Sequence, residues 1–531
     1  MEGAAVLAAR LPPPVVGDRQ VLILYDQLNL AVWPRDVLAV GPTLVFVEAL
    51  AYAAFLPHHP IKLTYILSAQ RHFALDCAAA GYNVLHWRTA GTHADGVAEI
   101  LQAYPGHITY MEPSEWEPRQ QLRALRARYP DRLTEIPNGF FLAPKPDFTA
   151  KIRRGYRLET FYREMRKRTG YLMVKGKPAG DRWNFDSENR RKLPANLKLP
   201  PVPTFSMDEI TKEVWEWVRG AFPHHFGDFR APFELAVTRA QALHLLQDFL
   251  EHRLDGFGPY EDAVRIGEPF LFHSVLSIYL NNGLLLPQEV CEGAIAAYDA
   301  GQARLNSVEG LVRQVLGWRE FIRIYYEAQM PAVREVNHFG FTQPLPAAFW
   351  DGEIDLACVR DALHHVRTRA YSHHIQRLMI LSNFSNLTQT DPRALNRWFY
   401  WAYADAYEWV ELPNVLGMAT YADGGILASK PYIAGGNYVH KMSDACAHCP
   451  YDVKQKTGDR ACPLNYLYWD FVAQHPSDFL ENGRVSLALR TYHKKTDAEK
   501  QAIADSAARF RQNLRRLGSE GVRHWGQNPK P

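Results

Sequence analysis

The sequence has few cysteines, no long apolar run and little net charge, and each of these absences excludes a class of protein. Only six cysteines occur in 531 residues, and the opening MEGAAVLAARLPPP lacks the apolar core of a secretion signal. A secreted, disulfide-linked protein is therefore not expected. No apolar run is long enough to cross a bilayer. We expect a cytoplasmic protein that does not enter a membrane.

Two further absences concern ligands and organisation. The formal net charge is +3, so any surface for nucleic acid must be a local patch. No G-x-G-x-x-G motif follows the first expected strand, and the sequence therefore carries no dinucleotide fingerprint there. No internal repeat is present, but a chain of 531 residues is too long to fold around a single hydrophobic core. Two or three domains are expected.

Residues 1–137 are predicted to form an α/β domain, because short apolar runs alternate with helical segments. The runs expected to be strands are 21–26, 44–48, 62–67, 83–87 and 107–112. This alternation predicts a doubly wound, Rossmann-like parallel sheet. Such sheets bind ligands at the carboxyl ends of their strands. Asp26 and Glu48 fall at such ends, although capping or loop polarity explains each residue alone.

The chain changes character at residue 138. The segment from Lys151 to Lys192 contains fourteen Lys or Arg but only five acidic residues, and aromatic residues are interleaved with them. This basic segment predicts phosphate contact, although a solvated amphipathic helix explains its first half equally well. The Pro-rich stretch 193–203 predicts an extended linker, so 138–205 is an interdomain segment. From 206 to 531 helical patterns dominate and predict a large all-helical domain.

Four cysteines have the spacing of a metal site. Cys358, Cys446, Cys449 and Cys462 form the pattern C-x87-C-x2-C-x12-C. Zinc ribbons usually pair two Cys-x-x-Cys knuckles, whereas only one knuckle is present here. The arrangement favours an iron–sulfur cluster over zinc, with unligated core thiols as the remaining alternative.

The stretch 359–381 is predicted to be one helix that carries two histidine pairs, His364–His365 and His373–His374. Nine residues separate the pairs, about 13 Å along a helix, so they cannot share one metal ion. A lone histidine is more often a satisfied core residue than a catalyst. One that faced a substrate would supply an acid near neutral pH.

An aromatic run at 397–415 is denser than packing needs and suggests single-electron transfer. Weaker signals are His273, Ser274 and Ser277, which could hold a phosphate, and Arg319. Core helices with polar edges explain these signals equally well. Together, the cysteines, the aromatic run and the basic segment point to one-electron chemistry on nucleic acid.

Several motifs spread over nearly the whole chain resemble those of a known family. They are SAQRHFA (68–74), LETFYREMRKRTGYLM (158–173), WNFDSENR (183–190), YEDA (260–263), GWREF (317–321), AYSHHIQRLMILSNF (370–384), YADAYEWVELPNVLGMATYADGG (403–425), KPYIAGGNYVHKMSDACAHCPYDVKQKTG (430–458) and ACPLNYLYW (461–469). The chain resembles the iron–sulfur bacterial cryptochromes and photolyases, also called prokaryotic (6-4) photolyases. The resemblance implies an N-terminal antenna domain and a C-terminal helical domain that binds FAD.

The resemblance also implies cofactors and the residues that hold them. A 4Fe-4S cluster would use the four cysteines, and 6,7-dimethyl-8-ribityllumazine would be the antenna, with Asp26 and Glu48 near it. Asp186 and Asp262 match carboxylates associated with Mg²⁺. The positions implied at the flavin are His273, Ser274, Ser277, Arg319 and Asp405, with Trp398 and Trp350 as electron relay.

The activity implied is light-driven repair of (6-4) photoproducts in UV-damaged double-stranded DNA. Photoexcited reduced FAD gives an electron to a lesion flipped out of the duplex. His373 and His374 would flank the lesion, with His374 as proton donor, and Tyr432 and Glu411 would line the same cavity.

The sequence departs from the family's pattern in two places. Phe399 follows Trp398 where the relay has a tyrosine, so Tyr400 or Trp401 would substitute, or photoreduction would be slower. Tyr52 and Ala53 stand where polar antenna contacts are expected.

Two other functions stay open. The first is a blue-light photoreceptor of the same architecture with little repair. The second is a light-independent iron–sulfur protein that binds nucleic acid. A monomer is expected in each case.

Overall fold

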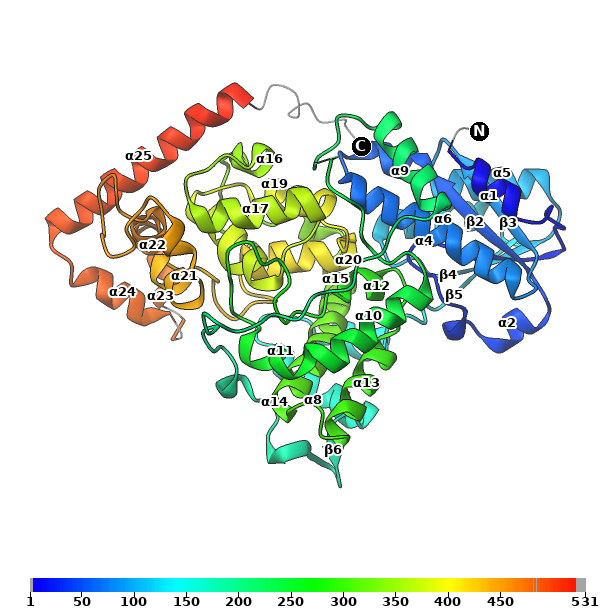
Figure 1. The fold of residues 1–531 in the computed structure, drawn as a ribbon, viewed down its shortest axis with the longest axis horizontal. Coiled ribbons are helices and arrows are strands. Elements are labelled where there is room, and N and C mark those ends of the chain that lie inside the picture. Colours follow the sequence, from blue (N-terminus) through cyan, green and yellow to red (C-terminus); the bar gives the residue numbers. More distant parts are fainter. Residues whose placement is uncertain (1–2, 229, 481, 484, 522–531) are drawn as a thin grey trace.

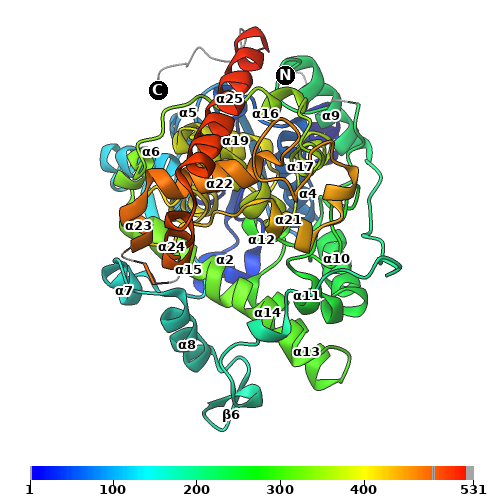
Figure 2. The same cartoon turned by 90° about the vertical axis from the view of Figure 1, so that its left-hand side faces the viewer.

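The computed structural model describes residues 3–228, 230–480, 482–483 and 485–521. An α/β domain, blue in Figure 1, packs against a larger helical domain that runs from green to red. Figure 2 shows helix α25 (Asp497–Gly521) in front, on the side of the helical domain away from the sheet. Across the described ranges, no helix combines the length and apolar character needed to span a membrane.

Five strands form one parallel sheet in the order β3-β2-β1-β4-β5. They are β1 (Arg19–Ile23), β2 (Thr43–Ala49), β3 (Val84–Thr89), β4 (His107–Met111) and β5 (Leu133–Ile136). The doubly wound α/β prediction is confirmed. β1 is central, since Gln20 pairs with Thr43 on one side and Ile108 on the other. The strand order reverses between β1 and β4, where sheets of this kind form their ligand crevice.

One expected strand is a helix. Residues 62–67 lie inside α4 (Pro60–Ala79), which is buried around most of its circumference. A helix that is apolar on every side shows no polar stripe, so a short apolar run within it resembles a buried strand. The remaining strand is β5, which pairs with β4 and was not expected from the sequence.

Helices surround the sheet and make up the rest of the chain. The helices of the first part are α1 (Ala5–Arg10), α2 (Arg35–Ala39), α3 (Leu50–Phe55), α5 (His93–Ala103), α6 (Trp116–Arg128), α7 (Lys145–Phe148), α8 (Leu158–Thr169) and α9 (Glu209–Ala221). The stretch 193–203 forms neither helix nor strand. After it, α9 packs on α4, so the chain passes once more over the α/β domain before it enters the helical domain.

The helical domain is built from short and medium helices. They are α10 (Arg239–His252), α11 (Leu254–Tyr260), α12 (Ser277–Asn281), α13 (Pro287–Asp299), α14 (Leu305–Val312), α15 (Glu320–Gln329), α16 (Ala348–Asp351), α17 (Ala357–Arg369), α18 (Asn383–Leu387), α19 (Pro392–Ala402), α20 (Glu408–Leu412), α21 (Gly436–Met442), α22 (Pro463–Gln474), α23 (Pro476–Leu480), α24 (Ser486–His493) and α25. Within the described ranges, three π-helical turns occur, η5 (Arg313–Arg319), η7 (Gln376–Ser382) and η8 (Pro413–Ala419). Such turns are frequent at functional sites.

The single helix expected over 359–381 is two segments. α17 ends at Arg369, and Ala370 takes a left-handed backbone with φ 50°. Tertiary hydrogen bonds hold the break, because the amide of Ala404 donates to the carbonyl of Ala370 at 2.9 Å and the hydroxyls of Ser372 and Tyr403 bond at 2.8 Å. These partners lie about thirty residues away, so local periodicity could not reveal them.

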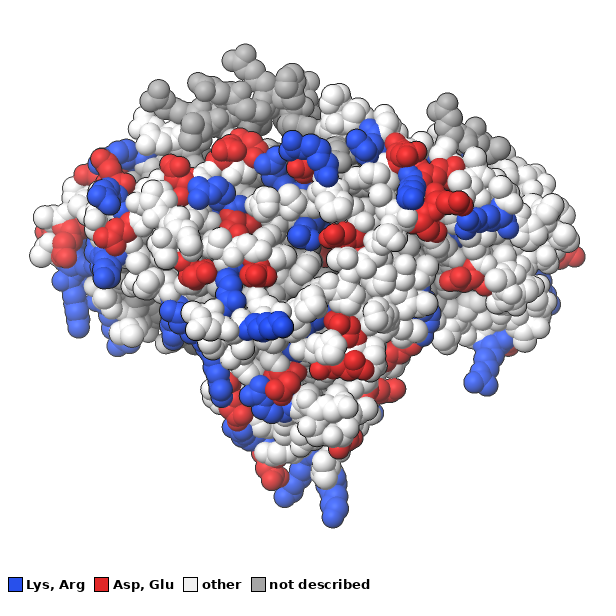
Figure 3. Space-filling model, viewed as in Figure 1, with Lys and Arg blue, Asp and Glu red and all other residues white. Residues whose placement is uncertain are grey.

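The basic segment forms α8 and a hairpin of β6 (Met173–Val174) and β7 (Lys177–Pro178) at the lower tip of Figure 1. Several of its cations are used internally. Arg166 is buried and donates to the carbonyl of Tyr171 at 3.3 Å, and Arg168 pairs with Asp147 at 2.5 Å. Lys175 and Lys177 are exposed. In Figure 3, blue side chains project at this tip, while both signs are mixed elsewhere on that face.

Candidate active site

A buried ion pair lies inside the helical domain. Arg377 donates through both terminal nitrogens to the carboxylate of Asp405, at 3.0 Å each. Ser277 donates to the same carboxylate at 2.7 Å, and Asn281 donates to the backbone carbonyl of Asp405 at 2.9 Å. Ser277 and Asp405, both predicted at the flavin, are therefore neighbours. No sequence motif singled out Arg377, although it lies three residues after His374 on the same turn.

Two imidazole rings stack in the same domain. The ring centroids of His273 and His373 are 4.6 Å apart, with their planes inclined by 14°. Burial lowers the pKa of His273 to about 3 and lowers that of His373 as well, so both are neutral at pH 7. Within the described residues, Nε2 of His273 and both ring nitrogens of His373 have no hydrogen-bond partner. A bound polar ligand would supply one.

His374 reaches solvent, unlike its neighbour His373. Desolvation of its ring by the surrounding protein, together with the Arg377 charge, lowers the pKa of His374 to about 4. His374 is therefore neutral at pH 7 in the free protein. An anion beside it would raise this pKa and let it carry a proton.

Glu411 is a buried carboxyl near the same groups. Burial raises the pKa of Glu411 to about 8. The Arg377 and Lys62 charges oppose this increase, and the Asp405 charge adds to it. Glu411 is therefore mostly protonated at pH 7 and can donate a hydrogen bond. Lys62 comes from α4 of the α/β domain and donates to the carbonyl of Tyr400 at 2.5 Å. Tyr432 is half-buried, with the ammonium of Lys430 5.7 Å from its ring centroid.

A bridging ring connects the two tryptophans of the predicted relay. The Phe226 ring lies 5.9 Å from Trp398 and 6.1 Å from Trp350. Trp401 packs on Trp350 at 5.3 Å, and Tyr403 lies 5.8 Å from Trp398. Trp398 is fully buried and its indole donates to a backbone carbonyl at 3.0 Å. Phe226 belongs to a loop outside the aromatic run, which is why the sequence did not reveal it.

The four predicted cluster cysteines line one small cavity. Cys358 lies in the first turn of α17, Cys446 and Cys449 in and just after a short 3₁₀ turn, and Cys462 at the start of α22. Burial raises the pKa of Cys358, of Cys446 to about 11 and of Cys462 to about 12, and neighbouring thiols add to each shift. Among the described residues, no three His, Cys, Asp or Glu side chains converge closely enough to hold a single metal ion.

A glycine keeps this cavity open. A Cβ added at Gly436 would lie 2.8 Å from Sγ of Cys462. Any larger residue there would press on the thiol. The cavity and its donors are suited to a group that thiolates bind.

Two aspartates predicted to hold Mg²⁺ lie near each other, but each has a cationic partner. Asp186 forms an ion pair with Arg313, and Asp262 lies 3.5 Å from Arg190. A third carboxyl, Glu261, joins them, and burial raises its pKa to about 7, with Asp262 and Asp186 adding to the shift. Arginines stand opposite both aspartates in this structure, and Mg²⁺ at this place stays a prediction.

Arg319 has partners other than Asp405. Its guanidinium pairs with Glu320 at 2.7 Å, donates to the carbonyl of Phe140 at 3.3 Å and lies 4.6 Å from the Phe141 ring. Ser274 lies in the loop before α12, where its hydroxyl accepts the amide of Leu276 at 3.4 Å. The structure thus groups Ser277 with Asp405 and places Arg319 at the boundary with residues 140–141.

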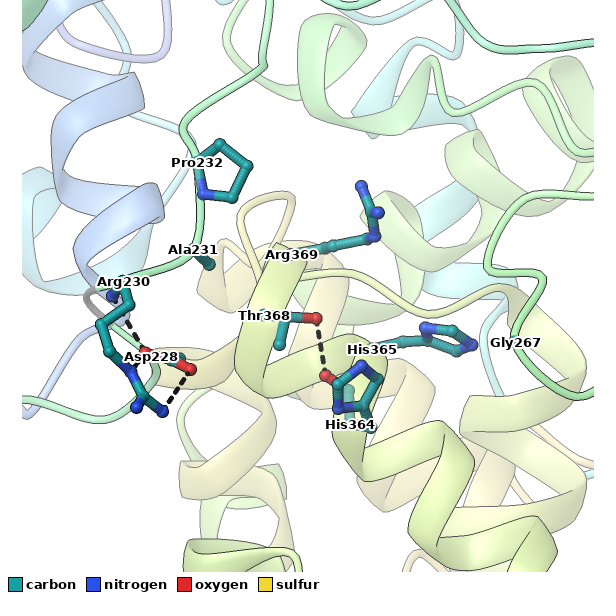
Figure 4. Close-up of a pocket in the computed structure, with 9 residues that line it drawn as sticks. All are labelled: Asp228, Arg230, Ala231, Pro232, Gly267, His364, His365, Thr368 and Arg369. Atoms are coloured by element: carbon teal, nitrogen blue, oxygen red, sulfur yellow. Dashed lines mark hydrogen bonds and ion pairs between the residues drawn. The ribbon is translucent and has the colours of Figure 1, made fainter.

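The first histidine pair borders a separate pocket of 360 Å³ (Figure 4). His364 and His365 extend from α17 toward it, with Arg369 above them and the Asp228–Arg230 pair at its far side. His365 is buried, and its Nε2 lies 3.4 Å from Asp361. His365 still lies close enough to His373 that its charge, after burial and His273, contributes to the lowered pKa of His373.

At the carboxyl end of the sheet, both predicted ligand contacts are buried. Arg71 binds the Glu48 carboxylate through two nitrogens, at 2.6 and 3.0 Å. Despite burial, His86 and Arg71 hold the pKa of Glu48 below its usual range. Burial raises the pKa of Asp26 to about 7, and the Glu115 charge adds to this. Both carboxylate oxygens of Glu48 are therefore bound by protein groups. Asp26 forms a buried carboxyl pair with Glu115, which the sequence did not suggest.

Comparison with known proteins places these features in a family. A model of deoxyribodipyrimidine photo-lyase-related proteins matches residues 21–233. A (6-4) photolyase of Agrobacterium fabrum is 40% identical over 503 residues, which cover 93% of this chain and 99% of that protein.

Solved structures show the same fold at low sequence identity. A bacterial class III photolyase from Agrobacterium tumefaciens aligns with TM-score 0.57 at 15% identity, and a Synechocystis cryptochrome with TM-score 0.57 at 16%. Each alignment covers 95% of this chain and 99% of the other.

Proposed function

The chain belongs to the deoxyribodipyrimidine photolyase-related family, and on this basis we propose that it repairs (6-4) photoproducts in DNA with light. The observation that carries the proposal is the group of His373, His374 and the Asp405–Arg377 pair. A stacked, unpartnered imidazole pair beside a solvent-accessible histidine suits a substrate that must be bound and protonated.

The buried polar groups fit FAD. The unpartnered Nε2 of His273 needs a polar ligand, and Ser277, Asp405 and Arg377 offer a fixed donor and acceptor set. We infer that these residues hold the flavin. When bound and reduced, FAD would absorb blue light and supply the electron that opens the lesion.

The protein's own part is positioning and proton transfer. A stacked lesion cannot reach a buried flavin, so the damaged bases must be flipped out of the duplex. His374 reaches solvent and would meet the flipped lesion from the protein side. The negative charge of the lesion and its phosphate would raise the pKa of His374 and allow it to donate a proton. Protonated Glu411 and Tyr432 would line the same cavity as hydrogen-bond donors.

We also infer that the four cysteines hold a 4Fe-4S cluster. Their shared cavity and the glycine that keeps it open support this assignment. Iron and acid-labile sulfide in equal amounts, about four of each per chain, are expected. Zinc in their place would contradict the cluster.

The remaining assignments follow from the same proposal. Three units are proposed, an α/β domain at 1–137, an interdomain segment at 138–205 and the FAD-binding domain at 206–531. We propose that the protein acts as a monomer in the cytoplasm on UV-damaged double-stranded DNA. Light scattering of the purified protein, with and without a duplex, tests the monomer.

The test of the proposed function is illumination of the purified protein with a duplex that carries one (6-4) photoproduct. We expect flavin absorption in the spectrum and restored thymines in the chromatogram only after blue light. Flavin and cluster without repair would favour a photoreceptor. A purified protein without flavin would contradict the proposal.

A further inference from the structure

The α/β domain has a ligand crevice by topology, between the carboxyl ends of β1 and β4. Side chains that follow four strands meet there, Tyr25 after β1, Tyr52 after β2, His93 after β3 and Glu115 after β4. If the family resemblance is followed, this is the place for a lumazine antenna. The side chains present decide whether such a ring fits.

Six rings fill the crevice, and we call them the closing cluster. They are Tyr25, Tyr52, His58, His93, Tyr400 and Tyr407. The Tyr25 ring stacks on His93 at 5.0 Å and on Tyr407 at 6.0 Å and lies 5.3 Å from Tyr52. Tyr52 in turn stacks on His58 at 5.1 Å. These are the separations of rings in direct contact.

A flat heterocycle has no room between them. An inserted ring needs about 3.5 Å on each face, hence about 7 Å between the rings that flank it. The stacked pairs of the closing cluster are 5.0 to 6.0 Å apart. A bicyclic ligand would therefore have to displace Tyr25 or Tyr52.

Two carboxylates of the crevice are already paired, whereas both ring nitrogens of His58 and the hydroxyl of Tyr407 have no partner within the described residues. Glu115 accepts hydrogen bonds from the hydroxyl of Tyr25, from the hydroxyl of Tyr400 at 3.1 Å and from the amide of Glu408 at 2.6 Å. Glu48 is fully buried and paired with Arg71. A ligand would find both carboxylates already satisfied.

The cluster also joins the two domains. Tyr400 lies in α19 and Tyr407 directly before α20 of the helical domain, whereas Tyr25 and Glu115 belong to the α/β domain. The hydrogen bonds that Tyr400 and Glu408 donate to Glu115 therefore cross the domain boundary.

We propose that the closing cluster replaces an antenna chromophore in this protein. The crevice serves as a fixed contact between the domains, and it binds neither lumazine nor another flat heterocycle of that size. The proposal rests on the family assignment only for the expectation of an antenna. Light would then be absorbed by the flavin alone.

The first test is a titration of the purified wild-type holoprotein with 6,7-dimethyl-8-ribityllumazine, followed by fluorescence polarisation. We expect no rise in polarisation, and we expect chromatography of the chromophores released by denaturation to show FAD without lumazine. Stoichiometric binding, or co-purified lumazine, would overturn the proposal. Neither readout depends on repair, so a failure of the proposed function leaves this test intact.

The second test opens the crevice. The double variant Tyr25→Ala/Tyr52→Ala removes two rings and is expected to bind lumazine at concentrations that leave the wild type unbound. Tyr104→Ala is the matched control, because Tyr104 packs edge-on against Trp87 in the same domain, outside the cluster. A folded double variant that also fails to bind would show that these rings do not close the site. If the double variant does not fold, the wild-type titration decides alone.

Discussion

The two domains of this protein differ in how closely rings pack around their buried polar groups. In the helical domain, the stacked pair His273–His373 keeps ring nitrogens without a partner in the described residues, next to an ion pair that a ligand could contact. In the crevice of the α/β domain, tyrosine hydroxyls and backbone amides saturate Glu115, and rings fill the space. Both regions contain buried polar atoms without a partner in the described residues, among them the His58 nitrogens in the crevice, so the packed rings are what distinguishes the crevice from the helical site.

The comparison suggests that only one of the two expected chromophore sites is kept. Substitutions in the helical domain should therefore change chemistry with little effect on folding. Substitutions in the closing cluster should change stability with little effect on chemistry.

The largest expected effect is on the helical side. His374→Ala should lower light-driven repair by about 10²- to 10⁴-fold, because a positioned proton donor is removed, while FAD stays bound. Repair per absorbed photon and the flavin absorbance measure the two outcomes. The matched control is His364→Ala, at the rim of the separate pocket. Wild-type turnover in His374→Ala would remove this residue from the mechanism.

The next effect is on the α/β side. Tyr25→Ala should lower the free energy of unfolding by about 3–5 kcal/mol, the usual cost of deleting a buried aromatic ring. Tyr25→Phe keeps the ring and should cost about 1–3 kcal/mol, for the one hydrogen bond that Glu115 loses. Denaturant unfolding measures both, and repair per bound FAD should not change. A large loss of repair with normal stability would contradict the contrast between the two domains.

A pH effect distinguishes buried Glu411. Its folded pKa, about 8, lies above the unfolded value, so the stability it contributes is complete at low pH and is lost as pH rises toward 8. Glu411→Gln removes this loss. The variant should gain stability relative to the wild type as pH rises from 5 to 8, measured as the difference in Tm. A difference that is constant across this range would show that Glu411 is ionised in the folded protein.

The smallest effect is expected outside both regions, at the β6–β7 tip. Lys175→Gln/Lys177→Gln should weaken binding to duplex DNA modestly, and the slope of log K against log salt should fall by about 0.9 for each phosphate that the variant no longer neutralises. Lys212→Gln, exposed on α9, is the control. Unchanged binding would assign the tip no part in DNA recognition.

Parts of the fold could be predicted because their signals are local. The strands at 21–26 and 44–48 show short runs of β-branched and aromatic residues, and helical patterns dominate the chain after residue 206. The first part of α4 was missed because the helix is buried on almost every side, so the six residues 62–67 carry no helical period. The break at Ala370 was missed because the groups that stabilise it come from residues 403 and 404.

The chemistry that is available can be seen in the sequence alone: four thiols in a cluster spacing, paired histidines, and an ordered alternation of strands and helices. Which of these groups are free to act depends on the tertiary structure. It leaves the His373 nitrogens without a partner among the described residues and saturates Glu48 with Arg71. It also brings Arg377 to Asp405 and closes the α/β crevice with Tyr25 and its neighbours. The physical reason is that hydrogen-bond satisfaction and room for a ligand depend on partners distant in sequence, which no local pattern records.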